Sequence, residues 1–345
     1  MKSHTRFLAA PLSAAVAVAM VSGCALTQSS KNEGSGASTS GASKAPVQIA
    51  YLTASAANVW LAASAKAMAA DAVKANVKIT TFDAKFQPGA AAKQIQDVIA
   101  AKKYKGIILA TSDGAAVIPA VQQALKAGLK IVVLNQIVGA KLNTADPQVA
   151  GVSASVLAPP QATGDRLGKL TVMACAKIDP CRVVYMFGQK GLPFDDAVRK
   201  GFNSVISGHV NIRVIAEAQG GFLGTDQPRK ATQDVIQAHP SFDVLVGSGD
   251  QQIQGALLAL DQAGKKVKLI GVGGSEHAIS GIKAGTWWGD VAGAPITEGH
   301  QAFAAMMEAI RDHKDLGGID VTTRLVNNGL ITKANVDKFT AQWAG

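Results

Sequence analysis

The sequence predicts an α/β protein of two doubly wound, Rossmann-like lobes joined by a hinge, and three observations lead to this fold class. The chain has 345 residues, which are too many for one small domain and suffice for two lobes of ordinary size. Hydrophobic residues make up 48% and charged residues 17% of the chain, which excludes a disordered chain. From Pro46 onward, short β-branched runs alternate with amphipathic helical stretches, a pattern typical of parallel sheets covered by helices on both faces.

The first series of this alternation forms the predicted first lobe, residues 46–135, which we expect to be completed by about 294–323. Its apolar runs are nearly continuous, as in strands that are buried on both faces. The predicted strands are Val47–Thr53, Val77–Phe82, Gly106–Ala110 and Lys130–Leu134. The predicted helices between them are Val59–Val73, Gly89–Ala101 and Ala115–Ala127.

The alternation then restarts and forms the predicted second lobe, residues 136–293, completed by about 324–345. The predicted strands are Arg182–Phe187, Ile212–Glu217, Phe242–Val246, Val267–Gly271 and Trp287–Val291, with a short strand near Val321–Leu325. The predicted helices are Leu157–Cys175, Asp195–Ile206, Asp226–Ala238, Gln251–Gln262, Ala278–Lys283 and Lys333–Trp343. A further predicted helix, Pro295 to about Arg311, lies in the segment that completes the first lobe.

The N-terminus predicts export. Lys2 and Arg6 precede an apolar run, Phe7–Val21, which is shorter than the roughly 20 residues of a membrane span and is typical of a signal peptide. The sequence Val-Ser-Gly-Cys at 21–24 resembles the bacterial lipobox, which implies removal of residues 1–23 and lipidation of Cys24. The alternative is an ordinary signal peptide followed by an incidental cysteine. Residues 24–45 are rich in Ser and Gly and predict a flexible tether.

Two further cysteines, Cys175 and Cys181, flank a five-residue segment. In an exported chain this spacing favours a short-range disulfide, and two inert thiols are the alternative. No histidine or acidic cluster accompanies the two cysteines at the spacing of a zinc site, so we expect no metal there.

The charge distribution does not favour nucleic-acid binding, and the motifs do not favour catalysis. The net charge is +10, but the Lys and Arg residues are scattered rather than clustered with aromatics. The sequence contains no phosphate-loop pattern, dinucleotide fingerprint, HExxH motif or paired CxxC motif. Ser275, Glu276 and His277 are adjacent, but a catalytic triad is assembled from separate loops, and Ser275 is better explained as a helix cap. We therefore expect neither an enzyme nor a cofactor.

Polar and aromatic side chains suited to binding a ligand lie just after the predicted strands. Ligands of doubly wound sheets bind at the carboxyl ends of the strands, so the turns there line the predicted cleft between the lobes. Trp60 and Phe222 lie on turns of different lobes, where closure can sandwich a ring-shaped ligand between them. The six candidate ligand-binding residues are Asn58, Trp60, Asp113, Asn135, Phe222 and Asp250. For Asn58, Asp113 and Asp250, an ordinary helix N-cap is the alternative.

From Pro46 to Phe339 the chain resembles the ribose-binding-protein-like group of periplasmic binding proteins. The resemblance lies in the order and spacing of six segments. These are IAYLTASAANVW (49–60), GIILATSDGAAVIPAV (106–121), AGLKIVVLN (127–135), DDAVRKGF (195–202), AHPSFDVLVGSGDQQIQGAL (238–257) and AGKKVKLIGVGG (263–274). It implies the type I periplasmic binding protein architecture.

The resemblance also implies roles for the candidate residues. Trp60 and Phe222 match the aromatics of the two lobes, Asn58 lies near a polar partner, and Asp113 matches a carboxylate that holds sugar hydroxyls. Asn135 stands where the family often has Asp, and Asp250 matches the acidic half of an Asn-Asp pair.

This sequence departs from the family at several polar positions of the second lobe. The family's Arg falls on Asp195 or Asp196, the Asn of the Asn-Asp pair on Gly249, an Asp on Gly273 and a late Gln on about Gly293. A missing partner for a buried hydroxyl costs on the order of 1–3 kcal/mol, so we expect an unmodified pentose to bind poorly.

The resemblance implies a lipid-anchored solute-binding protein of an ABC importer, at the periplasmic or external face of the cell membrane. It would capture a sugar-like or polyol-like ligand by hinge closure and deliver it, as a monomer, to a permease with a cytoplasmic ATPase. The alternatives are a lipid-anchored receptor for chemotaxis or signalling, and the same scaffold binding a non-sugar, for example an aromatic molecule.

Overall fold

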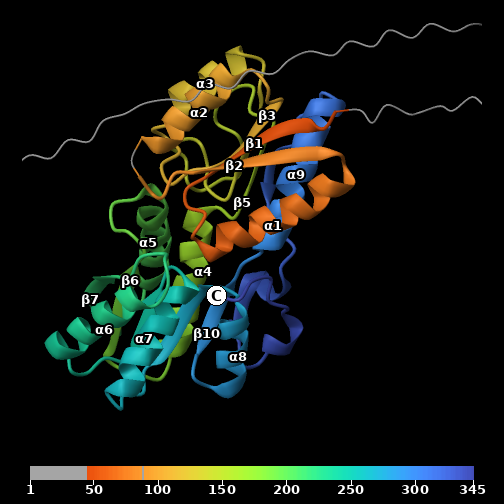
Figure 1. The fold of residues 1–345 in the computed structure, drawn as a ribbon. Helices are drawn as coiled ribbons and strands as arrows, with labels where there is room; N and C mark the ends of the chain where they lie inside the picture. Colours follow the sequence, from red (N-terminus) through yellow and green to blue (C-terminus); the bar gives the residue numbers. More distant parts are fainter. Residues whose placement is uncertain (1–44, 88) are drawn as a thin grey trace, which may run out of the picture. The chain divides into compact units, whose positions relative to one another are not determined.

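The computed structural model describes residues 45–87 and 89–345 (Figure 1). The expected signal peptide, the lipidation site Cys24 and almost all of the expected tether lie outside the described residues. Two six-stranded sheets organise the described chain, with strand orders β11-β5-β4-β3-β1-β2 and β12-β10-β9-β8-β6-β7. No helix within 45–87 and 89–345 combines the length and apolar character that a bilayer-spanning segment needs.

The first sheet is parallel throughout. Its strands are β1 (Val47–Thr53), β2 (Val77–Asp83), β3 (Gly106–Ala110), β4 (Lys130–Leu134), β5 (Ala154–Leu157) and β11 (Gly317–Asp320). The helices around it are α1 (Val59–Lys74), α2 (Ala90–Ala101), α3 (Ile118–Lys126) and α9 (Pro295–Arg311) (Figure 1). Because successive strand residues face opposite ways, Ile49 and Tyr51 pack in the core under α1 and α9, while Ala50 and Leu52 pack under α2 and α3.

The second sheet repeats this arrangement, with one antiparallel edge strand, β12. Its strands are β6 (Cys181–Phe187), β7 (Ile212–Gln219), β8 (Val244–Gly247), β9 (Lys268–Gly273), β10 (Gly289–Ala292) and β12 (Leu330–Thr332). The helices around it are α4 (Pro160–Cys175), α5 (Pro193–Ile206), α6 (Asp226–Ala238), α7 (Asp250–Gln262) and α8 (Glu276–Ala284), and two 3₁₀ turns are η1 (Val326–Gly329) and η2 (Val336–Lys338). Val183 and Tyr185 of β6 face α4 and α5, whereas Val184 and Met186 face the core under α6, α7 and α8.

The structure corrects the predicted boundary between the lobes. We expected the second lobe to begin at residue 136, but β5 pairs with β4, so the first sheet extends through Leu157. The predicted helix from Leu157 begins only at Pro160, where a proline suits the first helical turn. The four residues Ala-Ser-Val-Leu of β5 lie beyond a long loop and form too short a run to be distinguished from the start of that helix.

The returns of the chain to each sheet are close to the expected ones. α9 and β11 rejoin the first sheet, and β12 rejoins the second. The predicted strand near Val321–Leu325 is displaced and corresponds to β11, Gly317–Asp320. The predicted terminal helix Lys333–Trp343 is wrong, because only the single turn η2 forms and the Trp343 indole donates instead to the carbonyl of Gly273 at 2.8 Å.

A disulfide joins Cys175, the last residue of α4, to Cys181, the first residue of β6. Both cysteines are buried in the core between α4, α5 and the sheet. The bond therefore ties together the two ends of the loop by which the chain passes from α4 to the first strand of the second sheet.

Candidate functional site

A cavity of about 130 Å³ lies at the carboxyl ends of the strands and is lined by residues of both lobes. It offers room for on the order of ten water molecules, or for one small ring molecule. The lobes also meet directly at this place, since Nδ2 of Asn58 in the first lobe donates to the carbonyl of Phe222 in the second at 3.1 Å. The residues that line it include Asn58, Trp60, Phe86, Thr111, Ser112, Asn135, Gln136, Leu192, Phe194, Asp195, Phe222, Ser248, Gly249, Gln251, Gly293, Glu298, Thr322 and Trp343.

Five aromatic side chains form much of the wall: Trp60, Phe86, Phe194, Phe222 and Trp343. The rings of Trp60 and Trp343 meet edge to face at a centroid distance of 5.4 Å. The rings of Phe194 and Phe222 do the same at 6.1 Å. These are favourable geometries for aromatic pairs, so each pair is held as a unit.

Glycines provide the space for these rings. A Cβ atom at Gly293 would lie 2.2 Å from Cη2 of Trp60, and one at Gly188 would lie 2.0 Å from Cζ of Phe222. Both distances are far below the contact distance of two carbon atoms, so a side chain at either position would displace the ring. The Trp60 ring occupies the space next to position 293. This explains the glycine there, where the resemblance implies a glutamine.

Glu298 is the buried acid of the first-lobe wall. It lies in the first turns of α9 and is 1% exposed. Its Oε2 atom accepts from Nε1 of Trp60 at 2.8 Å and from Nδ2 of Asn135 at 3.4 Å, whereas Oε1 has no partner among the described residues. Burial raises the pKa of Glu298 to about 7, and the hydrogen bonds from Trp60 and Asn135 oppose this rise.

Asp195 is the buried acid of the second-lobe wall, at the start of α5. Its Oδ1 atom accepts from the backbone N–H of Gly188 at 2.8 Å and from Oγ of Ser248 at 2.9 Å, and Oδ2 accepts from the N–H of Gln189 at 3.0 Å. Burial raises the pKa of Asp195, and these hydrogen bonds oppose the rise. Because both oxygens are occupied, Asp195 fixes the turn between β6 and α5 on which Phe222 rests.

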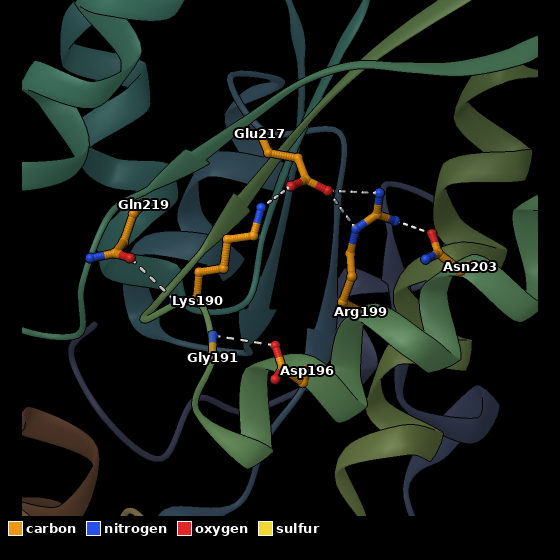
Figure 2. Close-up of polar contacts among 7 residues, drawn as sticks. All are labelled: Lys190, Gly191, Asp196, Arg199, Asn203, Glu217 and Gln219. Atoms are coloured by element: carbon orange, nitrogen blue, oxygen red, sulfur yellow. Dashed lines mark hydrogen bonds and ion pairs between the residues drawn. The ribbon is translucent and has the colours of Figure 1, made fainter.

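An exposed polar network supports the same turn from outside (Figure 2). Glu217 of β7 accepts from Nζ of Lys190 at 2.6 Å and from Nη2 of Arg199 at 3.2 Å, which lowers its pKa. The backbone N–H of Gly191 donates to Oδ1 of Asp196 at 3.3 Å. Figure 2 shows Lys190 and Arg199 reaching Glu217 from the turn and from α5, so the network ties the turn to both of its neighbours.

Four of the six predicted ligand-binding residues line the cavity: Asn58, Trp60, Asn135 and Phe222. Both ends of the Asn58 side chain are engaged, since Oδ1 accepts from the N–H of Leu61 and caps α1 while Nδ2 donates to the carbonyl of Phe222. Its expected N-cap role and its place in the cavity therefore coexist. Asn135 has a positive φ of 67°, and its side-chain amide donates to Glu298.

The other two, Asp113 and Asp250, do not line the cavity. Oδ1 of Asp113 accepts from the N–H groups of Ala115 and Ala116, both at 3.1 Å, and so closes a turn ahead of α3. Asp250 is completely buried, and its Oδ2 accepts from the N–H of Ser275 at 2.9 Å. A strand-end position alone did not show which way these two carboxylates turn.

Asp250 adjoins a second buried carboxyl group, Asp290 of β10. Burial raises the pKa of both, and the charge of Asp250 raises that of Asp290 further. Oδ1 of Asp250 and Oδ2 of Asp290 have no other partner, and both lie close to Gly271. This arrangement is typical of two carboxyl groups that share one proton.

Four further residues that line the cavity, Glu298, Gln251, Phe194 and Trp343, were not among the predicted ones. A signal for Glu298 was present. It is spaced four and eight residues from the buried Ala302 and Met306, so a charged residue lies on the apolar stripe of a predicted helix. No comparable signal marks Trp343, whose placement depends on tertiary contacts of the last residues.

Comparison with known proteins identifies the family. A family model described as the periplasmic binding protein domain matches residues 49–314. The chain is 23% identical over 267 residues to the ribose import binding protein of Bacillus subtilis (strain 168), covering 74% of this chain and 79% of that protein. It is 27% identical over 139 residues to the xylitol-binding protein of Mycolicibacterium smegmatis (strain ATCC 700084 / mc(2)155), covering 40% of this chain and 38% of that protein.

Solved structures share the fold. A galactofuranose binding protein superposes with a TM-score of 0.75 at 18% identity, covering 85% of this chain and 97% of that one. A solute binding protein of an ABC transporter from Bacillus halodurans C-125 with bound myo-inositol also has a TM-score of 0.75 at 18% identity, covering 88% and 99%. The two α/β lobes are therefore those of the type I periplasmic binding protein architecture, and the chain belongs to the ribose-binding-protein-like group of the periplasmic binding protein family.

Proposed function

We propose that this protein is a lipid-anchored solute-binding protein of an ABC importer. It captures a small sugar-like or polyol-like ligand between its two lobes and delivers the ligand to a permease. The observation that supports this most is the position of the cavity, which is lined from both lobes and closed by the bond between Asn58 and Phe222. A ligand seated there contacts both lobes at once, so it favours the closed form over any open one.

The relatives agree with this class of ligand. The printed names of the similar proteins refer to ribose, xylitol, galactofuranose and myo-inositol, all small and rich in hydroxyl groups. The cavity volume of about 130 Å³ suits one such molecule. The chain passes from one lobe to the other three times: before α4, before α9 and β11, and before β12. These three connecting segments supply the hinge.

Uptake by whole cells tests the proposal. A strain from which the gene has been deleted should lose high-affinity uptake of one radiolabelled sugar or polyol, and the wild-type gene should restore it. Intact uptake of every sugar and polyol tested, together with lost chemotaxis or gene induction, would contradict the importer and support a receptor instead.

A further inference from the structure

We propose, resting on the proposed function, that Glu298 determines which solutes bind. The ligand is a small ring molecule without negative charge that lies against the rings of Trp60 and Trp343. A hydroxyl or amine group of this ligand donates a hydrogen bond to Oε1 of Glu298. The site is therefore built for a less polar molecule than a fully hydroxylated monosaccharide.

The two oxygens of Glu298 have different surroundings. Oε2 already accepts hydrogen bonds from Trp60 and Asn135, whereas Oε1 is buried without a partner. Glu298 lines the cavity, and a buried acceptor without a donor is costly, so a donor on a ligand that reaches Oε1 would relieve this cost. Because Trp60 itself donates to Oε2, a ring lying on the Trp60 face can present its donor to the adjacent Oε1.

The two tryptophan rings beside this acceptor, Trp60 and Trp343, offer more hydrophobic contact than hydrogen bonds. Trp60 occupies the space above Gly293, and Trp343 occupies the space at Gly273, where a Cβ atom would lie 2.5 Å from Cζ2 of the ring. The indole N–H groups of both tryptophans are already used, by Glu298 and by the carbonyl of Gly273. What the two rings present to a ligand is therefore apolar surface, which favours C–H faces over hydroxyl groups.

Charge excludes one class of ligand. Among the described residues that line the cavity there is no lysine, arginine or histidine, whereas Glu298 and Asp195 are acids. A carboxylate or phosphate on the ligand would be buried without a counter-charge and would face these acids. An ammonium group, in contrast, would be paired by Glu298 and could lie over the aromatic rings.

Few other titratable groups face Glu298. Tyr51 of β1 is buried nearby, and burial raises its pKa well above the ordinary value. On α9 itself His300 lies at the surface, where its Nδ1 is 2.5 Å from Oδ2 of Asp71 on α1. Asp195 lies on the wall of the other lobe. Burial raises the pKa of Glu298 and its two hydrogen bonds oppose this rise, and His300→Gln serves as a control variant on the same helix.

The test is calorimetric titration of the purified protein with four ring compounds of similar size. These are trans-1,2-cyclohexanediol, cyclohexylamine, cyclohexanecarboxylate and myo-inositol. We expect the diol or the amine to bind at least tenfold more tightly than the carboxylate and than myo-inositol, and the stronger of the two identifies whether the donor is a hydroxyl or an ammonium group.

Glu298→Gln is the informative variant because it is isosteric. Its carbonyl can keep the bonds from Trp60 and Asn135, so an NH₂ donor then replaces the acceptor at Oε1. We expect the affinity for the diol or amine to fall at least tenfold. Glu308→Gln, on the same helix but paired at the surface with Lys314, should leave the affinity unchanged.

The pH profile separates direct contact from a structural role. Affinity should rise about tenfold from pH 6 to pH 8 in the wild type, since ionised Glu298 accepts and protonated Glu298 does not. The profile should persist in His300→Gln and vanish in Glu298→Gln.

Equal binding of the carboxylate, or equal effects of the variants at 298 and 308, would overturn the inference. Tight myo-inositol binding unaffected by Glu298→Gln would overturn the inference alone, whereas failure of all four compounds and of the sugars and polyols would overturn the proposed function too.

Discussion

Trp60 and Glu298 lie 238 residues apart in the chain, yet the indole Nε1 of Trp60 donates to Oε2 of Glu298 at 2.8 Å in the wall of the cavity. The two helices that carry them approach closely because α9 has a glycine at 299, where a Cβ atom would lie 2.3 Å from the carbonyl oxygen of Ser64 on α1. The bond joins the aromatic wall of the cavity to the buried acid, so a substitution of either residue changes the surroundings of the other.

Trp60→Phe should raise the pKa of Glu298 further, because it removes a donor that stabilises the charged form. The carboxyl carbon of Glu298 can be followed by NMR with ¹³C-labelled glutamate, and its titration midpoint should move upward from about 7. Glu298→Gln assigns the signal by removing it. A midpoint that stays in place would show that the indole bond does not form in solution.

Trp60→Ala should weaken ligand binding by on the order of 2–4 kcal/mol, or about 30- to 1000-fold, because contact area and ring stacking are lost. Calorimetry with the tightest-binding solute measures this directly. Val73→Ala is a matched control on the same helix, since Val73 is exposed on α1 and lies outside the cavity. Near-wild-type affinity of the Trp60 variant would return this ring to a purely structural role.

Gly293→Ala should displace the Trp60 ring, since the added Cβ would lie 2.2 Å from Cη2. We expect a destabilisation of about 1–3 kcal/mol and a changed tryptophan fluorescence spectrum. Gly208→Ala is the matched control, because the space around that position is open. Equal behaviour of the two variants in urea unfolding and in fluorescence would contradict the close contact between Gly293 and the Trp60 ring.

Unfolding should depend on pH through Glu298. Its folded pKa of about 7 exceeds the ordinary value of 4.5, so the folded state binds this proton more tightly than the unfolded state. The resulting stabilisation is complete below about pH 4.5 and is lost as the pH rises through about 7, a difference on the order of 3 kcal/mol. Urea unfolding at pH 5 and pH 8 should show this loss in the wild type and in Glu308→Gln, and a smaller loss in Glu298→Gln. An undiminished loss in Glu298→Gln would contradict the assignment.

Asp250 should matter for stability and not for ligand contact. Asp250→Ala leaves the N–H of Ser275 without its acceptor and removes the carboxyl group that faces Oδ2 of Asp290, which we expect to cost about 1–3 kcal/mol. Asp290→Asn replaces the shared proton by an amide hydrogen and should be milder. Ligand affinity of the folded Asp290→Asn protein should stay within about twofold of the wild type. A large loss of affinity would contradict this and would support the predicted ligand contact of Asp250.

Much of the fold could be predicted from the sequence because the strands that build it are nearly continuous apolar runs. Val47–Thr53, Gly106–Ala110 and Lys130–Leu134 were predicted with the bounds that the structure has. The pattern fails where a segment is short or is held by tertiary contacts. β5 has only four residues, and the last residues follow the contacts of Trp343 rather than a helical period.

The candidate site was predicted in part for a similar reason. Strand-end turns locate the cavity, so Asn58, Trp60, Asn135 and Phe222 were found. The direction of a side chain within such a turn depends on which N–H groups it can cap, and this turned Asp113 away. Glu298 was missed because it reaches the cavity from a helix, where a charged residue is usually solvated.

The central claim is that the cavity between the lobes binds one small solute, and calorimetric titration of the purified protein tests it most directly. The protein should first be unfolded in denaturant and refolded, so that molecules that purify with it are removed. We predict that at least one sugar, polyol or less polar ring compound without negative charge binds with a stoichiometry of one, and that Trp60→Ala weakens this binding. Refolded protein that binds none of these compounds, or binds one with an affinity that Trp60→Ala leaves unchanged, would contradict it.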